Sequence, residues 1–270
     1  MKEFFKDRRV ILLTCLFAFF TAWWLYLAFT QTNPLSLPVV VFTSSYGVIT
    51  LLGGFWGYKI ATRWGGRNSH IGRVVTYLTL GLLGEEVGQI FFTVTYFSNH
   101  FTVPYPSLAD VGFVSSAAFY ILALINLKRG LSIKFSKYSL RSRLALMIVI
   151  PFGALMLYSL VDSGYLFAGP DFTASVFFDT LYLVSYISYL MMAIVIAIFA
   201  IKSLGGVMRG RILLVLFSIL LQFAADYNYM YESSRGVVLL PSVNDLLYVA
   251  AFFGVGLAIL SCDPGTVDGL

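Results

Sequence analysis

Three acidic residues lie deep within apolar stretches of the chain, where a carboxylate needs a chemical reason. Glu85 and Glu86 follow Arg73 by twelve and thirteen positions. Asp226 follows Arg211 by fifteen positions. At a helical rise of 1.5 Å per residue, the glutamates lie roughly 18–20 Å and the aspartate roughly 22 Å beyond those basic residues. An acid at such a depth in a bilayer costs about 2.5–3.5 kcal/mol and is a functional candidate by default.

The neighbours of these acids are polar at helical spacing. Gln89 lies four residues after Glu85, and Gln222 lies four residues before Asp226. Residues three or four apart share one helix face, and no lysine or arginine lies at this depth to pair with the acids. A further acid, Asp162, lies near the end of another apolar stretch. The residues expected to bind a ligand or cation are Glu85, Glu86, Gln89, Asp162, Gln222, Asp226 and Tyr229.

The chemistry of these buried acids has three open alternatives. They are protonated and hydrogen-bonded to Gln, Ser and Tyr side chains, they bind or pass cations, or they bind a cationic or polar ligand. Glu85 and Glu86 are adjacent, so on a helix their side chains point about 100° apart. We therefore expect at least one of them to face a second helix.

A second group of acids follows a Pro-Ser turn. Ser107 precedes Asp110 by three residues, and Ser242 precedes Asp245 by three residues. A serine at the N-cap accepts from the N3 backbone N–H, and an acid at N3 accepts from the N-cap N–H. The spacing therefore predicts two helices that begin at the outer membrane interface.

An aromatic series follows each of these acids and a third, Asp179. Tyr182 lies three residues after Asp179, and Tyr248 lies three residues after Asp245. Packing between helices is the more common reason for such a face, and the wall of a pocket open to the outside is the functional alternative. The residues expected at the pocket mouth or helix caps are Ser107, Asp110, Asp179, Tyr182, Ser242, Asp245 and Tyr248.

The elements that must position these residues are membrane-spanning helices. The chain of 270 residues is 59% hydrophobic and 11% charged, against about 25% charged in a soluble domain. A span needs roughly 20 mostly apolar residues. The composition predicts an all-α polytopic membrane bundle, a single integral membrane domain over 1–270. Eight stretches qualify, near 10–30, 38–60, 73–97, 107–127, 143–165, 174–201, 211–231 and 242–262, giving four hairpins at about 10–60, 73–127, 143–201 and 211–262.

The basic residues predict the orientation of the bundle. All of the 18 lysines and arginines except Arg235 lie in the N-terminal tail or in the loops after the second, fourth and sixth predicted spans. Positive residues stay cytoplasmic during insertion, so both termini are expected inside. The net charge of +5 suits anionic membrane lipids and requires no nucleic acid.

Two of the hairpins resemble one another in sequence. The segments "GQIFFTVTYFSNHFTVPYPSLADVGFV" and "LQFAADYNYMYESSRGVVLLPSVNDLLYV" align through the Pro-Ser turn, and "FTASVFFDTLYLVSYISYLMM" is a weaker third copy. Internal repeats in membrane proteins often place a shared site where the copies meet. Duplication is the favoured interpretation, and convergence on one hairpin turn is the alternative.

Catalysis is the weaker class of function for this sequence. His70 and His100 both lie in or beside predicted loops, and no HExxH or G-x-S-x-G motif occurs. The sequence indicates no disulfide framework, because both cysteines lie toward the cytoplasmic side. No particular cofactor is indicated.

The segments "PYPSLADVGFV" and "LPSVNDLLYVAAF" resemble the Pro-Ser-x-x-Asp hairpins of multi-pass sensor regions in bacterial signalling proteins. In that family the membrane region usually precedes a diguanylate cyclase or kinase domain. The resemblance implies a module that senses something at the outer leaflet and changes its helix packing. This chain ends eight residues after Cys262, so signalling would require a separate partner or a longer parent chain.

These observations predict a noncatalytic, sensor- or receptor-like module of a prokaryotic inner membrane. It would bind a ligand or cation in an outward-facing pocket lined by carboxylates and aromatic residues. The alternatives are a proton- or cation-coupled transporter or channel, and a structural subunit of a membrane complex. The expected partners are membrane lipids and a separate signalling or complex partner.

Overall fold

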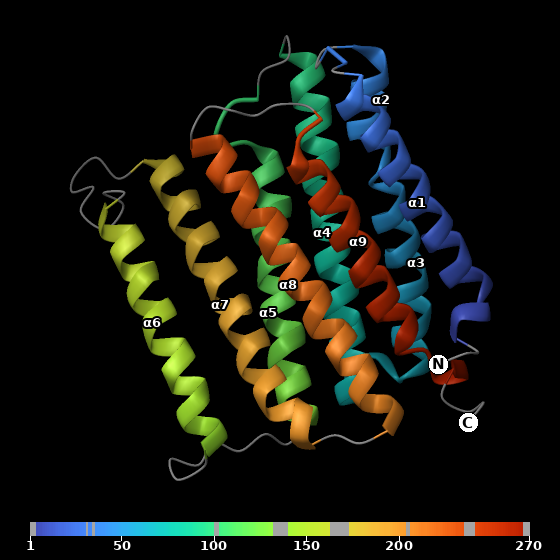
Figure 1. Ribbon diagram of the computed structural model, residues 1–270, viewed down its shortest axis with the longest axis vertical. Helices are drawn as coiled ribbons and strands as arrows, with labels where there is room; N and C mark the ends of the chain where they lie inside the picture. Colours follow the sequence, from blue (N-terminus) through green and yellow to red (C-terminus); the bar gives the residue numbers. More distant parts are fainter. Residues whose placement is uncertain are drawn as a thin grey trace.

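The computed structural model describes residues 4–30, 32–33, 36–99, 103–131, 140–162, 173–203, 206–234 and 241–266. Within these ranges the chain is all-helical and has no strand. Its helices lie side by side as one bundle (Figure 1). They are α1 (Arg8–Phe29), α2 (Leu37–Ser45), α3 (Val48–Arg63), α4 (His70–Ser98), α5 (Leu108–Gly130), α6 (Leu140–Asp162), α7 (Ala174–Ser203), α8 (Gly206–Ser234) and α9 (Val243–Ser261). Short 3-10 turns occur at Phe4–Lys6, Gly66–Asn68 and Pro264–Thr266.

Among the described residues, six helical segments are long and apolar enough to cross a membrane. They are Arg8–Phe29, Leu37–Arg63, Leu108–Gly130, Ala174–Ala200, Met208–Glu232 and Val243–Ser261. Large apolar side chains such as Phe19, Phe55 and Leu155 are exposed on the bundle, as expected where lipid rather than water covers the surface. The prediction of an all-α bundle is confirmed for the described residues, and these six segments have the length and apolar composition of membrane spans. The count of eight spans and their arrangement as hairpins stay predictions.

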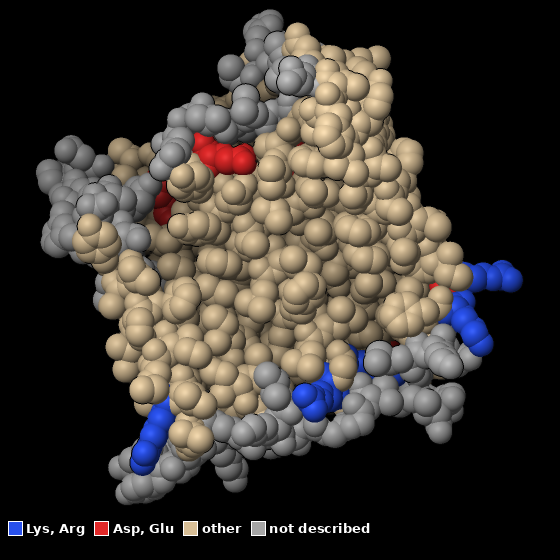
Figure 2. All heavy atoms as spheres, in the orientation of Figure 1, with Lys and Arg blue, Asp and Glu red and all other residues tan. Residues whose placement is uncertain are grey.

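Charged side chains are separated along the length of the bundle. On the face drawn in Figure 2, Lys and Arg gather toward one end, and a broad belt without charged side chains separates them from acidic side chains near the other end. α1 begins and α9 ends at this basic end (Figure 1). This distribution is what a protein needs to place an uncharged belt in hydrocarbon.

The helices that carry the Pro-Ser-x-x-Asp motifs begin as the sequence predicts. α5 and α9 each start with a complete capping box. The backbone N–H of Ser107 donates to Asp110 at 2.6 Å, and that of Ser242 donates to Asp245 at 2.8 Å. This outcome follows from local hydrogen bonding, which acts over four residues and is largely independent of the rest of the fold.

The stretch predicted as one continuous helix near 38–60 is divided into α2 and α3. The division falls at Tyr46 and Gly47. A Cβ atom at position 47 would lie on the carboxylate of Glu86 from α4. Thr50, in the first turn of α3, also donates a hydrogen bond to Glu86. The acid therefore occupies the space beside the break, where the exposed N–H groups of a helix start favour negative charge.

Helices α4 and α5 approach each other closely through glycine. A Cβ atom at Gly112 would lie 2.4 Å from the backbone nitrogen and 2.6 Å from the Cα atom of Gly88. At Gly84 it would lie 3.1 Å from the backbone nitrogen of Ser116. Small residues at a helix interface permit this contact between backbones. The contact brings Glu85, adjacent to Gly84, against α5.

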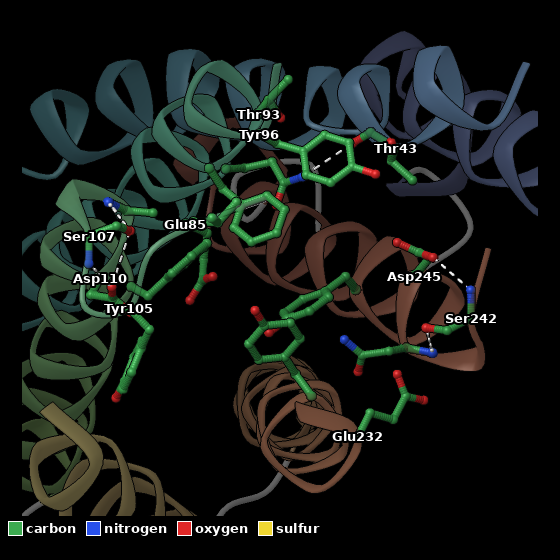
Figure 3. Close-up of a pocket in the computed structure, with 18 of the residues that line it drawn as sticks. Thr43, Glu85, Thr93, Tyr96, Tyr105, Ser107, Asp110, Glu232, Ser242 and Asp245 are labelled. Carbon is green, nitrogen blue, oxygen red and sulfur yellow. Dashed lines mark hydrogen bonds between the residues drawn. The ribbon is translucent and has the colours of Figure 1, made fainter. Parts of the chain in front are cut away.

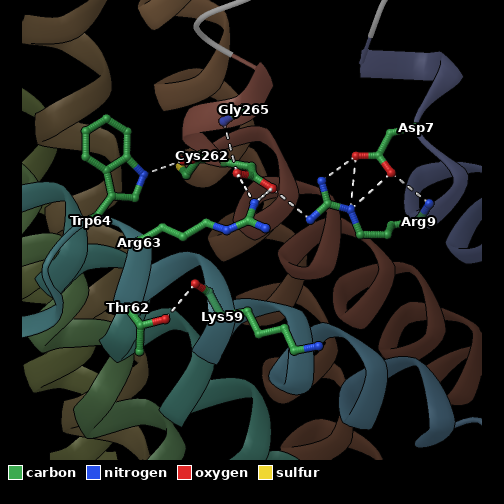
Figure 4. Close-up of polar contacts among 9 residues, drawn as sticks. Asp7, Arg9, Lys59, Thr62, Arg63, Trp64, Cys262 and Gly265 are labelled. Carbon is green, nitrogen blue, oxygen red and sulfur yellow. Dashed lines mark hydrogen bonds and ion pairs between the residues drawn. The ribbon is translucent and has the colours of Figure 1, made fainter.

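Ion pairs join the two ends of the described chain. Asp263, which follows α9, accepts from Arg9 of α1 at 2.7 Å and from Arg63 of α3 at 3.1 Å (Figure 4). Asp7 also pairs with Arg9, at 2.5 Å. The ion pairs therefore connect the segment after α9 to the start of α1 and to the end of α3.

We expect Asp263→Asn to lower the free energy of unfolding near neutral pH by about 1 kcal/mol, because it removes the charge that pairs with Arg9 and Arg63. The loss is small because these arginines are partly exposed. Burial alone would raise the pKa of Asp263, but the hydrogen bonds from Arg9, the Gly265 backbone and Arg63 hold that pKa below its ordinary 3.8. The stabilisation is therefore present above the unfolded-state pKa and lost as pH falls through the lower folded-state pKa.

Melting temperatures of both proteins, measured from neutral pH to about pH 3, check this sign. The difference in melting temperature between wild type and Asp263→Asn should become smaller below about pH 4. A difference that grows with acidity would contradict the assignment.

Candidate functional site

A cavity of about 670 Å³ lies at the end of the bundle opposite the Arg9–Asp263 cluster. Residues of α2, α4, α5, α7, α8 and α9 line it, with the turns before α5 and α9 at its mouth (Figure 3). Its five carboxylates are Glu85, Asp110, Asp179, Glu232 and Asp245. Its seven tyrosines are Tyr46, Tyr96, Tyr105, Tyr182, Tyr186, Tyr229 and Tyr248. Among the described residues, no lysine, arginine or histidine lines it.

Glu85 carries the deepest of these carboxylates. Its side chain is 3% exposed, and its Oε1 atom accepts from the hydroxyl of Ser116 on α5 at 2.5 Å. In the described part of the chain, its Oε2 atom has no hydrogen-bond partner. The α4–α5 glycine contact holds this carboxyl against α5, and Figure 3 shows it among the residues that face the cavity.

Asp110 and Asp245 have two roles. Each completes a helix cap with one oxygen, and each also lines the cavity. The Tyr182 hydroxyl on α7 donates to Oδ1 of Asp110 at 2.7 Å, and that of Tyr46 lies 3.5 Å from Oδ1 of Asp245. The donors are neutral hydroxyls, so they orient the carboxyl groups without placing a positive charge beside them.

The mouth carries two further acids. The Tyr105 hydroxyl donates to Asp179 at 2.5 Å, and the Asn228 amide donates to Glu232 at 2.9 Å. Glu232 is near enough to Asp245 for the two like charges to interact. These partners are again neutral, which leaves the region electronegative.

Aromatic rings form two walls between the acids. On α7 the ring centroids of Tyr182 and Tyr186 lie 5.6 Å apart. Across the cavity, Phe252 lies 5.6 Å from Tyr248 and 6.1 Å from Tyr46. These contacts join residues of α7 on one side and of α9 and the α2–α3 break on the other. The cavity therefore combines ring faces with carboxylates.

Asp226 lies behind this wall and does not line the cavity. It accepts from Tyr189 at 2.5 Å, from Gln222 at 3.0 Å and from Tyr248 at 3.2 Å. Tyr248 thus connects the two regions, because its side chain lines the cavity while its hydroxyl donates to Asp226. The carboxyl is enclosed by side chains from three helices, an arrangement that suits a structural polar centre beneath the cavity.

Glu86 points away from Glu85, toward α3, as the angle between adjacent helical residues predicts. It lines a separate pocket of about 110 Å³. Ser44, Gln89 and Thr93 contribute to both pockets. Glu86 is thus a neighbour of the main cavity rather than part of its lining.

The structure brings most of the sequence-predicted residues together. Those that line the main cavity are Glu85, Gln89, Ser107, Asp110, Asp179, Tyr182, Tyr229, Ser242, Asp245 and Tyr248. Those that do not are Glu86, Gln222 and Asp226. Asp162 closes α6, and its side chain lies outside the described residues.

Several lining residues carried no clear signal in the sequence. Tyr46 lies inside a stretch that resembles an unbroken span, and Glu232 lies near the end of α8 with no motif around it. Tyr105 directly precedes the Pro-Ser turn, and its place beside a repeated motif was the available clue. Tyr186 differs from these residues, because its helical spacing from Asp179 and Tyr182 places it on the aromatic face that the sequence predicts.

The arrangement is suited to electrostatic binding of a positive group. Carboxylates oriented by neutral donors, in a partly enclosed site, attract a cation more strongly than they would in water. Among the described residues, no three His, Cys, Asp or Glu side chains converge as a metal site. The five acids are instead spread around a space large enough for a molecule.

Comparison with known proteins places the chain in no established group. No family model, no curated protein and no solved structure matches it. The function therefore has to follow from the geometry of the cavity.

Proposed function

We propose that this protein is a noncatalytic integral membrane module that binds a small ligand or cation in a pocket open to the outer side of a prokaryotic inner membrane. The observation that carries the proposal is the cavity of about 670 Å³, lined by five carboxylates and, within the described residues, by no basic side chain. Its volume falls in the range of roughly 300–1,000 Å³ typical of ligand sites.

The proposed topology has eight spans with both termini in the cytoplasm. α2 and α3 together form one span, and α4 and α6 are added to the six apolar segments. α4 begins next to basic Arg73 and packs along α5, which supports its place within the bilayer despite Glu85 and Glu86. The basic end then faces the cytoplasm, and the cavity faces outward.

The proposed role is that of a sensor or receptor. α4–α5 and α8–α9 are the two sequence repeats, and each supplies cavity carboxylates at its turn, Asp110 in one and Asp245 in the other. A ligand held between the repeats would change how they pack, and a separate signalling partner would detect that change. The resemblance to bacterial sensor regions supports the same role.

A transporter or channel is the second candidate, and the α2–α3 break favours it. Broken helices beside an intramembrane acid are common at transporter sites, and here Gly47 lies against Glu86. Uptake of labelled ligand into proteoliposomes separates the two roles. A sensor binds without flux, whereas a carrier accumulates the ligand inside.

Cysteine labelling tests the outward opening. In a variant with Cys15 and Cys262 replaced by serine, we expect Thr93→Cys, in the cavity wall, to react with a membrane-impermeant maleimide added outside intact cells. Asn68→Cys, in the 3-10 turn before α4, is the matched control and should react only after the membrane is opened. Labelling of Asn68→Cys but not Thr93→Cys from outside would reverse the orientation and reject the outward-facing pocket.

A further inference from the structure

The size of the cavity is informative about its occupant. A water molecule takes about 30 Å³ of liquid volume, so a bare inorganic ion would leave most of the 670 Å³ empty of ligand. In the part of the chain that the structure describes, the acids also fail to converge as metal ligands do. The space suits a molecule with several carbon atoms.

The charge around the cavity selects the sign of that molecule. Glu85 and Asp110 lie on one side, and Asp245 and Glu232 lie on the other (Figure 3). An anion would meet like charge on both sides. A neutral molecule would leave the carboxylates without a positively charged partner. A positive group placed between the two sides is attracted by both.

Glu85 supplies an independent indication that a positive group belongs there. Its side chain is more than nine-tenths buried, and one carboxylate oxygen is without a hydrogen-bond partner among the described residues. That oxygen is not sealed by protein atoms and stays accessible from the cavity, where a carboxylate oxygen takes its partner from water or from a ligand. Because Glu85 lines the cavity, a ligand can supply the missing contact.

The aromatic walls favour an ammonium group in particular. Cations are attracted to ring faces within about 6 Å of the centroid, most strongly where water is excluded. Tyr182 and Tyr186 on α7 face the cavity from one wall, and Tyr248 and Phe252 on α9 face it from another. Rings and carboxylates together are the usual surroundings of organic ammonium ions.

We propose that the ligand of this cavity is an organic ammonium cation, an amine or quaternary ammonium group on a small carbon frame. The proposal rests on the proposed function, because it names the ligand class of the same pocket. The positive group lies between Glu85 and the acids of α8 and α9, with its carbon substituents against the tyrosine rings.

Three probes of the same shape and different charge test this directly. Choline carries a trimethylammonium group, 3,3-dimethylbutan-1-ol is its neutral carbon isostere, and 3,3-dimethylbutanoate is a similar anion. Each is titrated by calorimetry into the purified chain in lipid nanodiscs, with sodium chloride added to equal ionic strength. We expect choline to bind at least tenfold more tightly than the alcohol, and the anion to bind not at all.

Two results would overturn the ligand class. Equal binding of choline and the alcohol would show a pocket that recognises shape rather than charge, and would leave the proposed binding function standing. If choline, benzyltrimethylammonium and tetraethylammonium all fail to bind at millimolar concentrations, the ammonium proposal is wrong. The cysteine-labelling test reports separately on whether an outward pocket exists, so the two failures are distinguishable.

Discussion

Gly112→Ala is expected to lower the free energy of unfolding by about 3 kcal/mol, the upper part of the range for overpacking. The added methyl would lie 2.4 Å from the backbone nitrogen of Gly88 and 2.9 Å from the carbonyl oxygen of Gly84. These are backbone atoms, so neither can turn aside as a flexible side chain can. Helices α4 and α5 must separate, and Glu85 must move away from Ser116.

The matched control is Gly153→Ala. Gly153 lies within α6, and a Cβ atom there would meet no atom of the described residues within 4 Å. Alanine has the higher helix propensity by about 1 kcal/mol, so this variant should melt at or slightly above the wild-type temperature. Thermal melting of the three purified proteins measures the difference. Equal melting of Gly112→Ala and wild type would contradict the close contact between α4 and α5.

Glu85→Gln is expected to weaken the binding of choline by at least about tenfold, or about 1.4 kcal/mol. The amide keeps the shape of the side chain and can still accept from the Ser116 hydroxyl, so the fold should be preserved. The loss comes from replacing the deepest carboxyl that faces the cavity, whose ionised form would balance a bound cation, with an amide that cannot ionise. Charge pairs of this kind couple by about 1.5 kcal/mol or more in closed sites.

Glu86→Gln is the control for that variant. It makes the same chemical change at the next residue, but its carboxyl accepts from Thr50 and lies outside the main cavity. Calorimetric titration of both variants should show a large loss for position 85 and less than about twofold change for position 86, because that charge is not in the cavity. Equal losses at both positions would mean that only the overall charge of the region matters.

The sequence was sufficient to predict the features that depend on short-range rules. The starts of α5 and α9 follow from a serine and an aspartate three residues apart, and the structure contains both caps. The different directions of Glu85 and Glu86 follow from helical geometry alone. The all-helical membrane architecture follows from composition, because hydrocarbon leaves the backbone few other ways to satisfy its hydrogen bonds.

Features that depend on contacts between distant segments could not be predicted in this way. Asp226 and Gln222 share a helix face as expected, but Tyr189 of α7 and Tyr248 of α9 enclose the acid behind the cavity wall. The division of α2 from α3 depends on a carboxyl from α4. Neither the covering tyrosines nor that carboxyl is near its partner in the sequence.

The most direct test of the central claim, that the cavity holds an organic cation, is the position of a bound ammonium analogue. Arsenocholine replaces the nitrogen of choline with arsenic, whose anomalous scattering locates the charged group in a crystal. We predict one arsenic peak inside the cavity, between Glu85 and Asp245 and within about 6 Å of a tyrosine ring. A cavity without a peak, in crystals that show arsenic elsewhere on the protein, would contradict the account.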